Sequence, residues 1–194
     1  MNESDMQHGK NWRGQSVRGW VATEKFRGAR LYWDGIAAWS RGGLCVALPA
    51  EIRAALPAGR ALDCEVWAGR GPAGGTCEVE AAQAVTHGVW SPRLRLLVLD
   101  APDVLAPYAE RLAVARSLVN SPRVSVIGHE VLTGLPHLER LFAATARAGG
   151  EGLMLHHPTA LYTRARVATL LKVKLDPALA RGVVRDLSPI ARAA

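Results

Sequence analysis

The amino-acid sequence predicts an α+β fold in which antiparallel sheets are flanked by helices. Strand-like and helix-like segments are interleaved without the strict alternation that a doubly wound parallel sheet requires. Asp34-Gly35 lies between the apolar segments 31–33 and 36–39, which predicts a tight β-hairpin and therefore antiparallel pairing. With 194 residues, 49% of them hydrophobic, the chain can bury the core of one domain.

Strands are expected where apolar residues run together or alternate with polar ones between turn residues. The first begins at Trp20 and ends at Lys25, just before the hairpin. In chain order, the expected strands are 20–25, 31–33, 36–39, 61–67, 93–99, 124–127, 152–155, 168–173 and 182–185.

Four helices are expected between these strands. The third is amphipathic, with Leu112, Ala115 and Leu118 on one face, and Gly149-Gly150 ends the fourth. The expected helices are 49–57, 78–86, 108–119 and 138–148. Because the first residues are polar, we expect an N-terminal arm or loop at 1–16. One domain is expected at 17–187, followed by a C-terminal tail at 188–194.

The chain is basic, with 24 Lys and Arg against 17 Asp and Glu and a net charge of +7. Most of these cations are arginines, whose planar guanidinium suits bidentate contacts to phosphate. This balance favours nucleic acid or a nucleotide as partner. A high-GC genome produces the same arginine and alanine bias, so composition alone leaves both explanations open.

Cysteines stand at positions 45, 64 and 77, and no pair has the spacing of a zinc site. We expect them to be reduced and structural. The N-terminus lacks the cationic and apolar regions of a secretory signal, and no apolar run has transmembrane length. The sequence therefore leads us to expect a soluble, cytoplasmic protein that does not bind membranes.

The stretch 23–30, Thr-Glu-Lys-Phe-Arg-Gly-Ala-Arg, carries the first candidate for chemistry. Gly28 allows close backbone approach to a ligand, and Arg30 offers a fork suited to phosphate. A lysine packed among cations and apolar groups can have a lowered pKa, which frees its amine for attack. We therefore interpret Lys25 as a nucleophile toward the α-phosphate of a nucleotide. A surface lysine before a hairpin is the alternative for this stretch alone.

Later stretches place further charged residues on strands. Glu65 lies opposite Val66 on its strand, and Glu151 precedes an apolar strand. Lys172 and Lys174 share one face, because alternate strand residues point the same way. An anion between them, such as a triphosphate or a polynucleotide backbone, would relieve their repulsion. A solvated edge strand guarded by lysines explains this feature equally well.

Taken together, these stretches resemble the ATP-dependent DNA ligases of the covalent nucleotidyltransferase superfamily, and above all the small bacterial ligases. The family's opening stretch, S-E-K-L-D-G-V-R-A-Y-W-D-G, is matched at Glu24-Lys25, Gly28, Arg30 and residues 32–35. Five further motifs follow in family order: S-R-x-G at 40–43, L-D-G-E-L-W-x-G-R at 62–70, F-D-A-P at 99–102, G-E-G-L-M-L at 150–155 and L-K-V-K at 171–174. The resemblance spans residues 20 to about 185.

This resemblance implies an ATP-grasp-like nucleotidyltransferase (adenylation) domain. It implies an enzyme that forms a lysyl-AMP intermediate at Lys25 and joins nicks in duplex DNA during repair, with ATP and Mg²⁺ (or Mn²⁺) as cofactors. The implied catalytic residues are Lys25, Lys172 and Lys174. The implied nucleotide-binding residues are Glu24, Arg30, Glu65, Leu99, Lys172 and Lys174. The implied DNA-binding residues are Arg27, Arg30 and Arg41, and the implied metal-binding residues are Glu151 and Glu65.

Several positions depart from the family pattern. Arg27 replaces the aspartate of K-x-D-G, which concerns the sealing step more than adenylylation. Leu99 replaces the aromatic residue that stacks on adenine, a loss of about 0.5–1.5 kcal/mol. His156 stands where the family has an arginine or lysine, and at neutral pH a histidine is only partly charged.

Only 20 residues follow Lys174, too few for the OB-fold domain of the ligases. Three explanations stay open: a fragment, a protein partner that replaces the OB domain, or a minimal enzyme. We expect the chain to act as a monomer. Two other functions also stay open, namely a catalytically impaired DNA-binding module and an adenylylating enzyme that acts on RNA or another acceptor.

Overall fold

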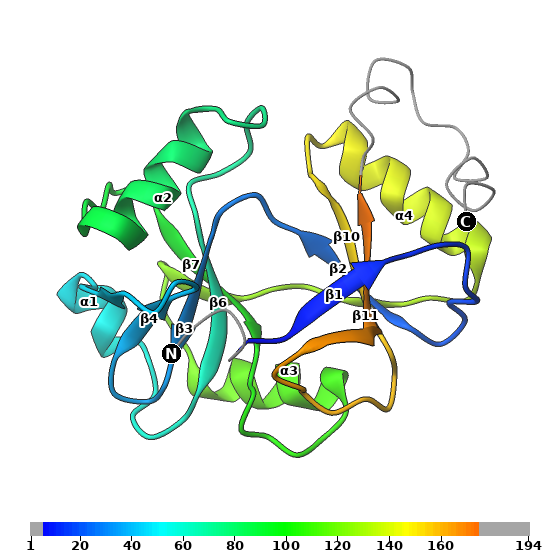
Figure 1. Ribbon diagram of the computed structural model, residues 1–194, viewed down its shortest axis with the longest axis horizontal. Coiled ribbons are helices and arrows are strands. Elements are labelled where there is room, and N and C mark those ends of the chain that lie inside the picture. The colour runs from blue at the N-terminus through cyan, green and yellow to red at the C-terminus, as the bar shows by residue number, and fades with distance from the viewer. Residues whose placement is uncertain (1–5, 175–194) are drawn as a thin grey trace.

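The computed structural model describes residues 6–174 and contains two β-sheets and four helices in that range (Figure 1). The five-stranded sheet A has the order β1 (His8–Asn11), β11 (Arg166–Lys174), β10 (Gly152–His156), β2 (Val21–Lys25), β9 (Glu130–Val131). The six-stranded sheet B has the order β5 (Cys45–Val46), β4 (Ala38–Ser40), β3 (Ala29–Trp33), β6 (Leu62–Trp67), β7 (Arg95–Asp100), β8 (Val124–Val126).

Antiparallel pairing dominates both sheets, as predicted. Only the β1–β11 and β7–β8 pairs are parallel among the described strands. The Asp34-Gly35 hairpin is confirmed, because β3 and β4 pair antiparallel on either side of it. The Asp34 carboxylate accepts hydrogen bonds from the backbone N–H groups of Ile36 and Ala37 at 2.8 and 2.7 Å, which fixes the turn.

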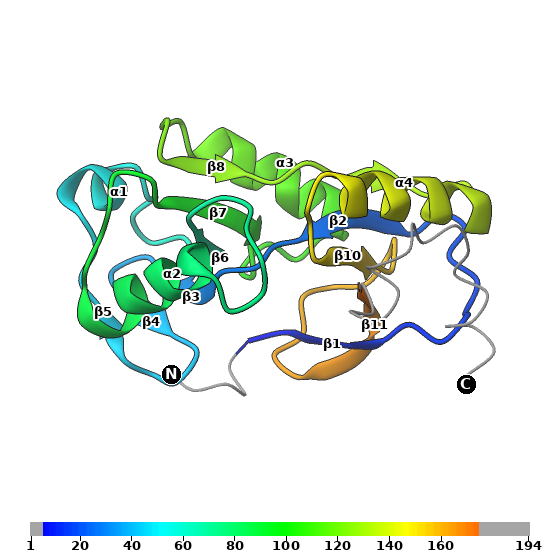
Figure 2. The same ribbon diagram turned by 90° about the horizontal axis from the view of Figure 1, so that it is seen from above.

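The helices are α1 (Ala50–Ala54), α2 (Thr76–His87), α3 (Tyr108–Leu118) and α4 (Leu135–Arg147). Helices α1 and α2 lie with sheet B at one end of the molecule, and α4 lies with sheet A at the other (Figures 1 and 2). Helix α3 packs on β7 and β8, and its Tyr108 and Leu112 also contact Val21 of β2. It therefore joins the two sheets. None of the helices within residues 6–174 is long and apolar enough to cross a membrane.

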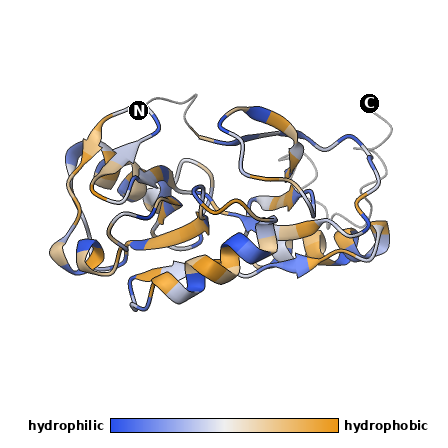
Figure 3. Cartoon of the chain, turned by 90° about the horizontal axis from the view of Figure 1, so that it is seen from below, coloured by the Kyte–Doolittle hydropathy of each residue, from blue (hydrophilic) through white to orange (hydrophobic). Residues whose placement is uncertain are grey.

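Each sheet buries one face against its own helices, because alternate residues of a strand point to opposite sides. Apolar residues consequently run along the strands, whereas the helices carry both apolar and polar residues (Figure 3). Beneath α2, the strands of sheet B contribute Leu31, Trp33, Leu62, Cys64, Val66, Leu96 and Val98. Beneath α4, the strands of sheet A contribute Ala22, Leu153, Leu155, Leu171 and Val173. The residues that alternate with these along each strand point to the opposite face of the sheet.

The main correction to the sequence analysis concerns the N-terminal segment. Residues 8–11, expected in an arm or loop, form strand β1 and pair with β11. Their sequence, His-Gly-Lys-Asn, has no apolar alternation, so no local pattern announced a strand. Gly9 fits closely against β11, since a Cβ there would lie 2.9 Å from the Leu170 carbonyl oxygen. Met6 and Trp12, on either side, are buried.

The other differences are small. Strands β5 and β9 have two residues each and were not expected. Helix α4 begins three residues earlier than expected, because Pro136 lies in its first turn, where proline needs no N–H partner. The expected strand 182–185, the domain end at 187 and the tail 188–194 lie outside the described residues.

A buried ion pair holds α3 to the end of β7. Arg111 of α3 donates from Nε and Nη2 to Asp100 at 2.7 and 2.9 Å, and both side chains are about 95% or more buried. Arg111 Nη1 also donates to the carbonyl oxygens of Ala106 and Ala160. These contacts tie β7, α3 and the loop between β10 and β11 to one side chain.

We expect Arg111→Met to destabilise the protein by about 3–5 kcal/mol, because it leaves the Asp100 carboxylate buried without its cation. Arg60→Ala is the matched control. It removes the arginine of a more exposed pair, Arg60–Asp103 at 2.8 Å, and should cost less than about 1 kcal/mol. Urea unfolding of both variants measures the difference, and equal losses would contradict the assignment of Arg111 as an anchor.

Candidate active site

A cavity of about 380 Å³ lies between the two sheets. All ten residues that the sequence analysis named as site residues line it, namely Glu24, Lys25, Arg27, Arg30, Arg41, Glu65, Leu99, Glu151, Lys172 and Lys174. Strands from both ends of the chain bring these side chains together. Their grouping is an observation, whereas their individual roles remain predictions.

On sheet A, strand alternation turns charged residues toward this cavity. Lys172 and Lys174 of β11 line it, whereas Leu171 and Val173 between and beside them pack under α4. The antiparallel register places Lys25 of β2 opposite Gly152 of β10, close to Glu151. The predicted shared face of the two lysines therefore exists, and it faces the cavity.

Sheet B contributes the facing wall by the same alternation. Arg30 of β3 is the register partner of Glu65 of β6, and both line the cavity. Their neighbours Leu31, Cys64 and Val66 are buried in the core beneath α2. The expected orientation of Glu65, opposite Val66, is thus confirmed.

Gly28 makes a close contact within the protein that the sequence analysis missed. A Cβ at this position would lie 2.1 Å from the Val66 carbonyl oxygen, so only glycine allows the chain to cross so close to β6. Its N–H donates to Glu65 Oε1 at 3.1 Å. This approach is to the protein's own strand β6, and Gly28 also lines the cavity, so its approach to a ligand stays a prediction.

Lys25 points inward and forms an ion pair with Glu151, with Nζ 2.6 Å from Oε2. The second carboxylate oxygen of Glu151 lies 3.7 Å from Lys174 Nζ. Lys25 and Glu151 are each about one-fifth exposed, so a ligand can reach both. The candidate nucleophile Lys25 and the candidate phosphate-binding cation Lys174 thus both lie beside the candidate metal ligand Glu151.

Several groups that line the cavity have shifted pKa values, among them Glu65 and Lys172. Burial raises the pKa of Glu65 to about 7, and the nearby cations Arg30 and Lys25 limit this rise. The pKa of Lys172 is lowered by its burial and by repulsion from neighbouring cations, chiefly Arg166 and Lys174. Around Lys172, the positive charge in the cavity therefore exceeds the negative charge of the nearby acids. This excess favours an anionic ligand.

Arg30 makes a contact that the sequence analysis missed. It donates from Nε and Nη2 to the two carboxylate oxygens of Asp63, a residue that is fully buried on β6. Tyr162 and Gln7, also absent from the prediction, bond to the same pair. The aspartate of the L-D-x-E motif was a signal for this pair. Tyr162 lies 99 positions from Asp63 and gave none.

Glu24 lies at the rim. Its two carboxylate oxygens accept hydrogen bonds from Arg70 at 2.6 and 2.8 Å. Strand alternation gives it the orientation of Ala22, away from Lys25, although it still borders the cavity. Arg70, which follows β6, was not among the predicted site residues.

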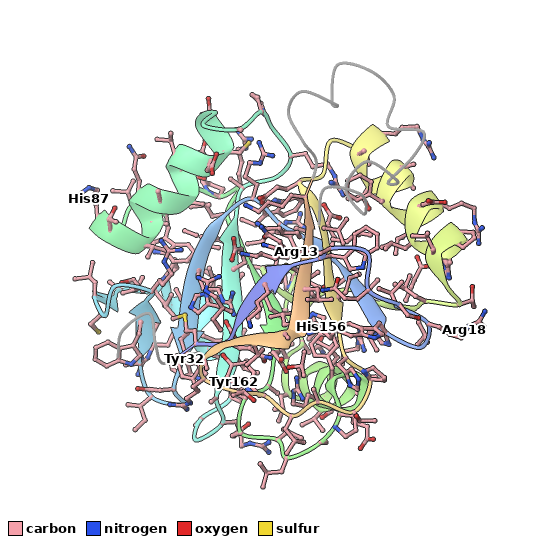
Figure 4. The ribbon with its side chains drawn as sticks, turned by 45° about the vertical axis from the view of Figure 1, so that its right-hand side comes forward. Arg13, Arg18, Tyr32, His87, His156 and Tyr162 are labelled. Carbon is pink, nitrogen blue, oxygen red and sulfur yellow. The ribbon has the colours of Figure 1, made fainter. Side chains whose placement is uncertain are left out.

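Part of the cavity lining consists of aromatic and apolar side chains. The His156 ring, labelled in Figure 4, stacks on Tyr108, with centroids 3.5 Å apart and planes within 5°. Burial and the nearby Arg111 and Arg30 cations lower the pKa of His156 well below its usual value, so the ring is neutral. With Leu99 and Met154, which also line the cavity, it provides a flat, weakly polar surface.

The acids of the cavity allow a simple test for a metal. No group of three or more His, Cys, Asp or Glu side chains able to hold a metal ion occurs in residues 6–174. Asp63, Asp100 and Glu24 are paired with arginines, and the other acids of the lining are Glu78 and the two predicted metal-binding residues, Glu65 and Glu151. Mg²⁺ is commonly held by one or two carboxylates, with water and substrate phosphates as its other ligands. The two glutamates fit that pattern.

Comparison with known proteins gives a consistent result. No family model matches the chain. A DNA ligase of Haemophilus influenzae is 29% identical over 181 residues, which cover 88% of this chain and 63% of that protein. The chain thus spans less than two thirds of the length of this curated relative.

Solved structures of DNA ligases match the fold. A Lig E DNA ligase has a TM-score of 0.75 at 27% identity, and the match covers 88% of this chain and 68% of that one. The Chlorella virus DNA ligase-adenylate has a TM-score of 0.65 at 17% identity, covering 88% and 67%. The second likeness concerns the fold alone. The resemblance predicted from the motifs is confirmed: the chain has the α+β fold of a DNA ligase nucleotidyltransferase domain and is similar to DNA ligases in sequence.

Proposed function

We propose that the chain is an ATP-dependent DNA ligase-type adenylyltransferase, which forms lysyl-AMP at Lys25 and joins nicks in duplex DNA. One observation carries the proposal. Lys25 Nζ lies inside a cavity between two sheets, in contact with Glu151 and bordered by Lys172 and Lys174. Similarity to DNA ligases supports the choice of substrates.

In the first step, the Lys25 amine attacks the α-phosphorus of ATP. An N–P bond forms, the bond to the bridging oxygen breaks, and pyrophosphate leaves with that electron pair. Only the unprotonated amine has a lone pair, so Lys25 must lose its proton and separate from Glu151 before attack. The ion pair described above is therefore the resting arrangement.

Lys172 and Lys174 would neutralise the negative charge on the phosphate oxygens. Phosphoryl transfer depends mostly on in-line placement and on cations around the transferred group. Both ammonium groups already face the cavity and repel each other there, so an anion relieves a cost present in the free protein. Glu65 would bind the ribose, and Leu99 and His156 would border the base.

Glu151 and Glu65 would hold Mg²⁺ (or Mn²⁺), which when bound would supply further positive charge to the phosphates. In the later steps, AMP would pass from Lys25 to the 5′-phosphate at a nick, and the 3′-hydroxyl would then displace AMP. Arg41, exposed at the border of the cavity, and Arg27 would contact the DNA backbone. A protein partner with an OB-fold domain would add contacts to the DNA. Apart from that partner, we propose that the protein is a cytoplasmic monomer.

Incubation with labelled ATP and Mg²⁺ tests the first step. We expect label on the denatured wild-type protein and none on Lys25→Ala, because no other lysine can replace its amine. Lys10→Ala is the control, since Lys10 is exposed on β1 and does not line the cavity. Intact mass reveals protein that is already adenylylated. A wild-type protein with neither label nor bound AMP would refute the enzyme and leave a DNA-binding module.

The pre-formed adduct can then be offered nicked DNA and nicked RNA. We expect sealing of DNA. Transfer to RNA alone would reassign the acceptor without affecting the first step.

Glu65 should make stability depend on pH. Its pKa is about 7 in the folded protein and near 4.5 when unfolded, so the fold retains a proton that the unfolded chain releases. Wild-type stability from this group is full below pH 4.5 and is lost as pH rises to about 7. The free energy of unfolding of Glu65→Gln minus that of the wild type should therefore increase as the pH rises from 4.5 to 7, by at most about 3 kcal/mol. A difference that is constant from pH 4.5 to 8 would contradict the shift.

Arg27 should contribute to DNA binding through phosphate. We expect Arg27→Ala to weaken binding of nicked duplex and to reduce the slope of log affinity against log salt by about 1. Arg53→Ala is the control. Arg53 is a residue of helix α1, lies over the Trp33 ring and does not line the cavity. Equal slopes for Arg27→Ala and wild type, measured by fluorescence anisotropy, would remove Arg27 from the DNA interface.

A further inference from the structure

Arg30 belongs to a closed ring of hydrogen bonds. Its Nε and Nη2 donate to Asp63, and the Tyr162 hydroxyl donates to Asp63 Oδ2 at 2.7 Å. The Gln7 N–H donates to the Tyr162 oxygen at 3.0 Å, and Arg30 Nη2 donates to the Gln7 carbonyl oxygen at 3.4 Å. Four segments distant in sequence thus meet around one guanidinium.

The ring connects the two sheets at the cavity wall. Tyr162 lies in the loop 157–165, which leaves sheet A after β10 and crosses to sheet B before β11. Two further bonds fasten this loop, from Arg111 to the Ala160 carbonyl and from Arg164 to the Tyr32 hydroxyl, both at 2.9 Å. Tyr32 is the register partner of Asp63, and Figure 4 labels Tyr32 and Tyr162 in the same region of the molecule.

Two bonds to one carboxylate fix the plane of the guanidinium as well as its position. Asp63 is about 99% buried, so water cannot replace a lost partner freely. Burial and the Asp63 charge raise the pKa of Tyr162, which keeps its hydroxyl protonated and able to donate. Without that donor, Asp63 Oδ2 would bond to Arg30 alone and could turn with it.

We propose that Tyr162 and Asp63 are positioning residues, which set the orientation of Arg30 toward a phosphate in the cavity, and that the N-terminal segment completes the arrangement through the backbone of Gln7. The inference rests on the proposed function, since Arg30 needs a phosphate partner for its orientation to matter. A ring that only ties the sheets together would affect stability and leave the chemistry unchanged.

Tyr162→Phe separates these roles, because it removes one hydroxyl and keeps the ring packed. Tyr32→Phe is the matched control. It also removes a buried hydroxyl bonded between loop 157–165 and sheet B, but that bond does not involve Arg30. Thermal unfolding compares the stability of the two variants. Single-turnover rates compare formation of lysyl-AMP at saturating ATP and sealing of nicked DNA by the pre-formed adduct.

We expect Tyr162→Phe to slow one or both steps about tenfold, since misplacing a phosphate-binding group by about 1 Å has effects of this size or larger. Tyr32→Phe should change both rates less than twofold, at a similar loss of Tm. Asp63→Asn, which removes the charge that orients Arg30, should slow the same step as Tyr162→Phe. The step affected identifies which phosphate Arg30 contacts.

Unchanged rates in Tyr162→Phe, or equal losses in Tyr162→Phe and Tyr32→Phe, would overturn the positioning role. A slower step in Asp63→Asn that differs from the step slowed in Tyr162→Phe would also overturn it. A wild-type protein that forms no adduct at Lys25 would instead refute the proposed function, so the two failures are distinguishable.

Discussion

The structure depends on the two-residue period of the β-strand. Each sheet has one apolar face, which its own helices cover, and the remaining faces of both sheets border the same cavity. A single-residue slip of β11 would exchange Lys172 with Val173, burying an ammonium under α4 and placing an apolar side chain in the cavity. Core packing and site assembly are therefore enforced by the same register.

Acidic and basic side chains of the cavity form ion pairs, and positive charge remains around Lys172. Asp63 forms an ion pair with Arg30, and Glu151 forms one with Lys25. Burial raises the pKa of Glu65 to about 7, so this carboxyl group is partly protonated near neutral pH. Asp63 and Glu151 each have a cation as partner, so the free protein avoids isolated charge at these two acids. Lys174 also lies 3.7 Å from Glu151, whereas Lys172 is repelled by Arg166 and Lys174, which favours an anion. The cations that would bind phosphate are thus kept in place by acids of the protein itself.

Much of the fold and the site could be predicted, because the signals were local. The hairpin at Asp34-Gly35, the shared face of Lys172 and Lys174 and the side of Glu65 all follow from neighbouring residues and strand period. The rest depends on contacts between distant positions. Strand β1 pairs with a strand about 160 residues later, and Tyr162 reaches Asp63 across 99 positions. The close approach of Gly28 to β6 also joins distant positions, because Val66 is 38 positions later in the sequence.

The order of strands has a consequence for how the molecule is built during synthesis. All strands of sheet B come from the continuous stretch 29–126, whereas sheet A draws β1 and β2 from before it and β9, β10 and β11 from after it. Sheet B can therefore condense while the chain is still emerging from the ribosome. Sheet A must wait for the last described strand, and its loop closure spans nearly the whole chain, which is entropically slow. The cavity would consequently be the final part of the molecule to form.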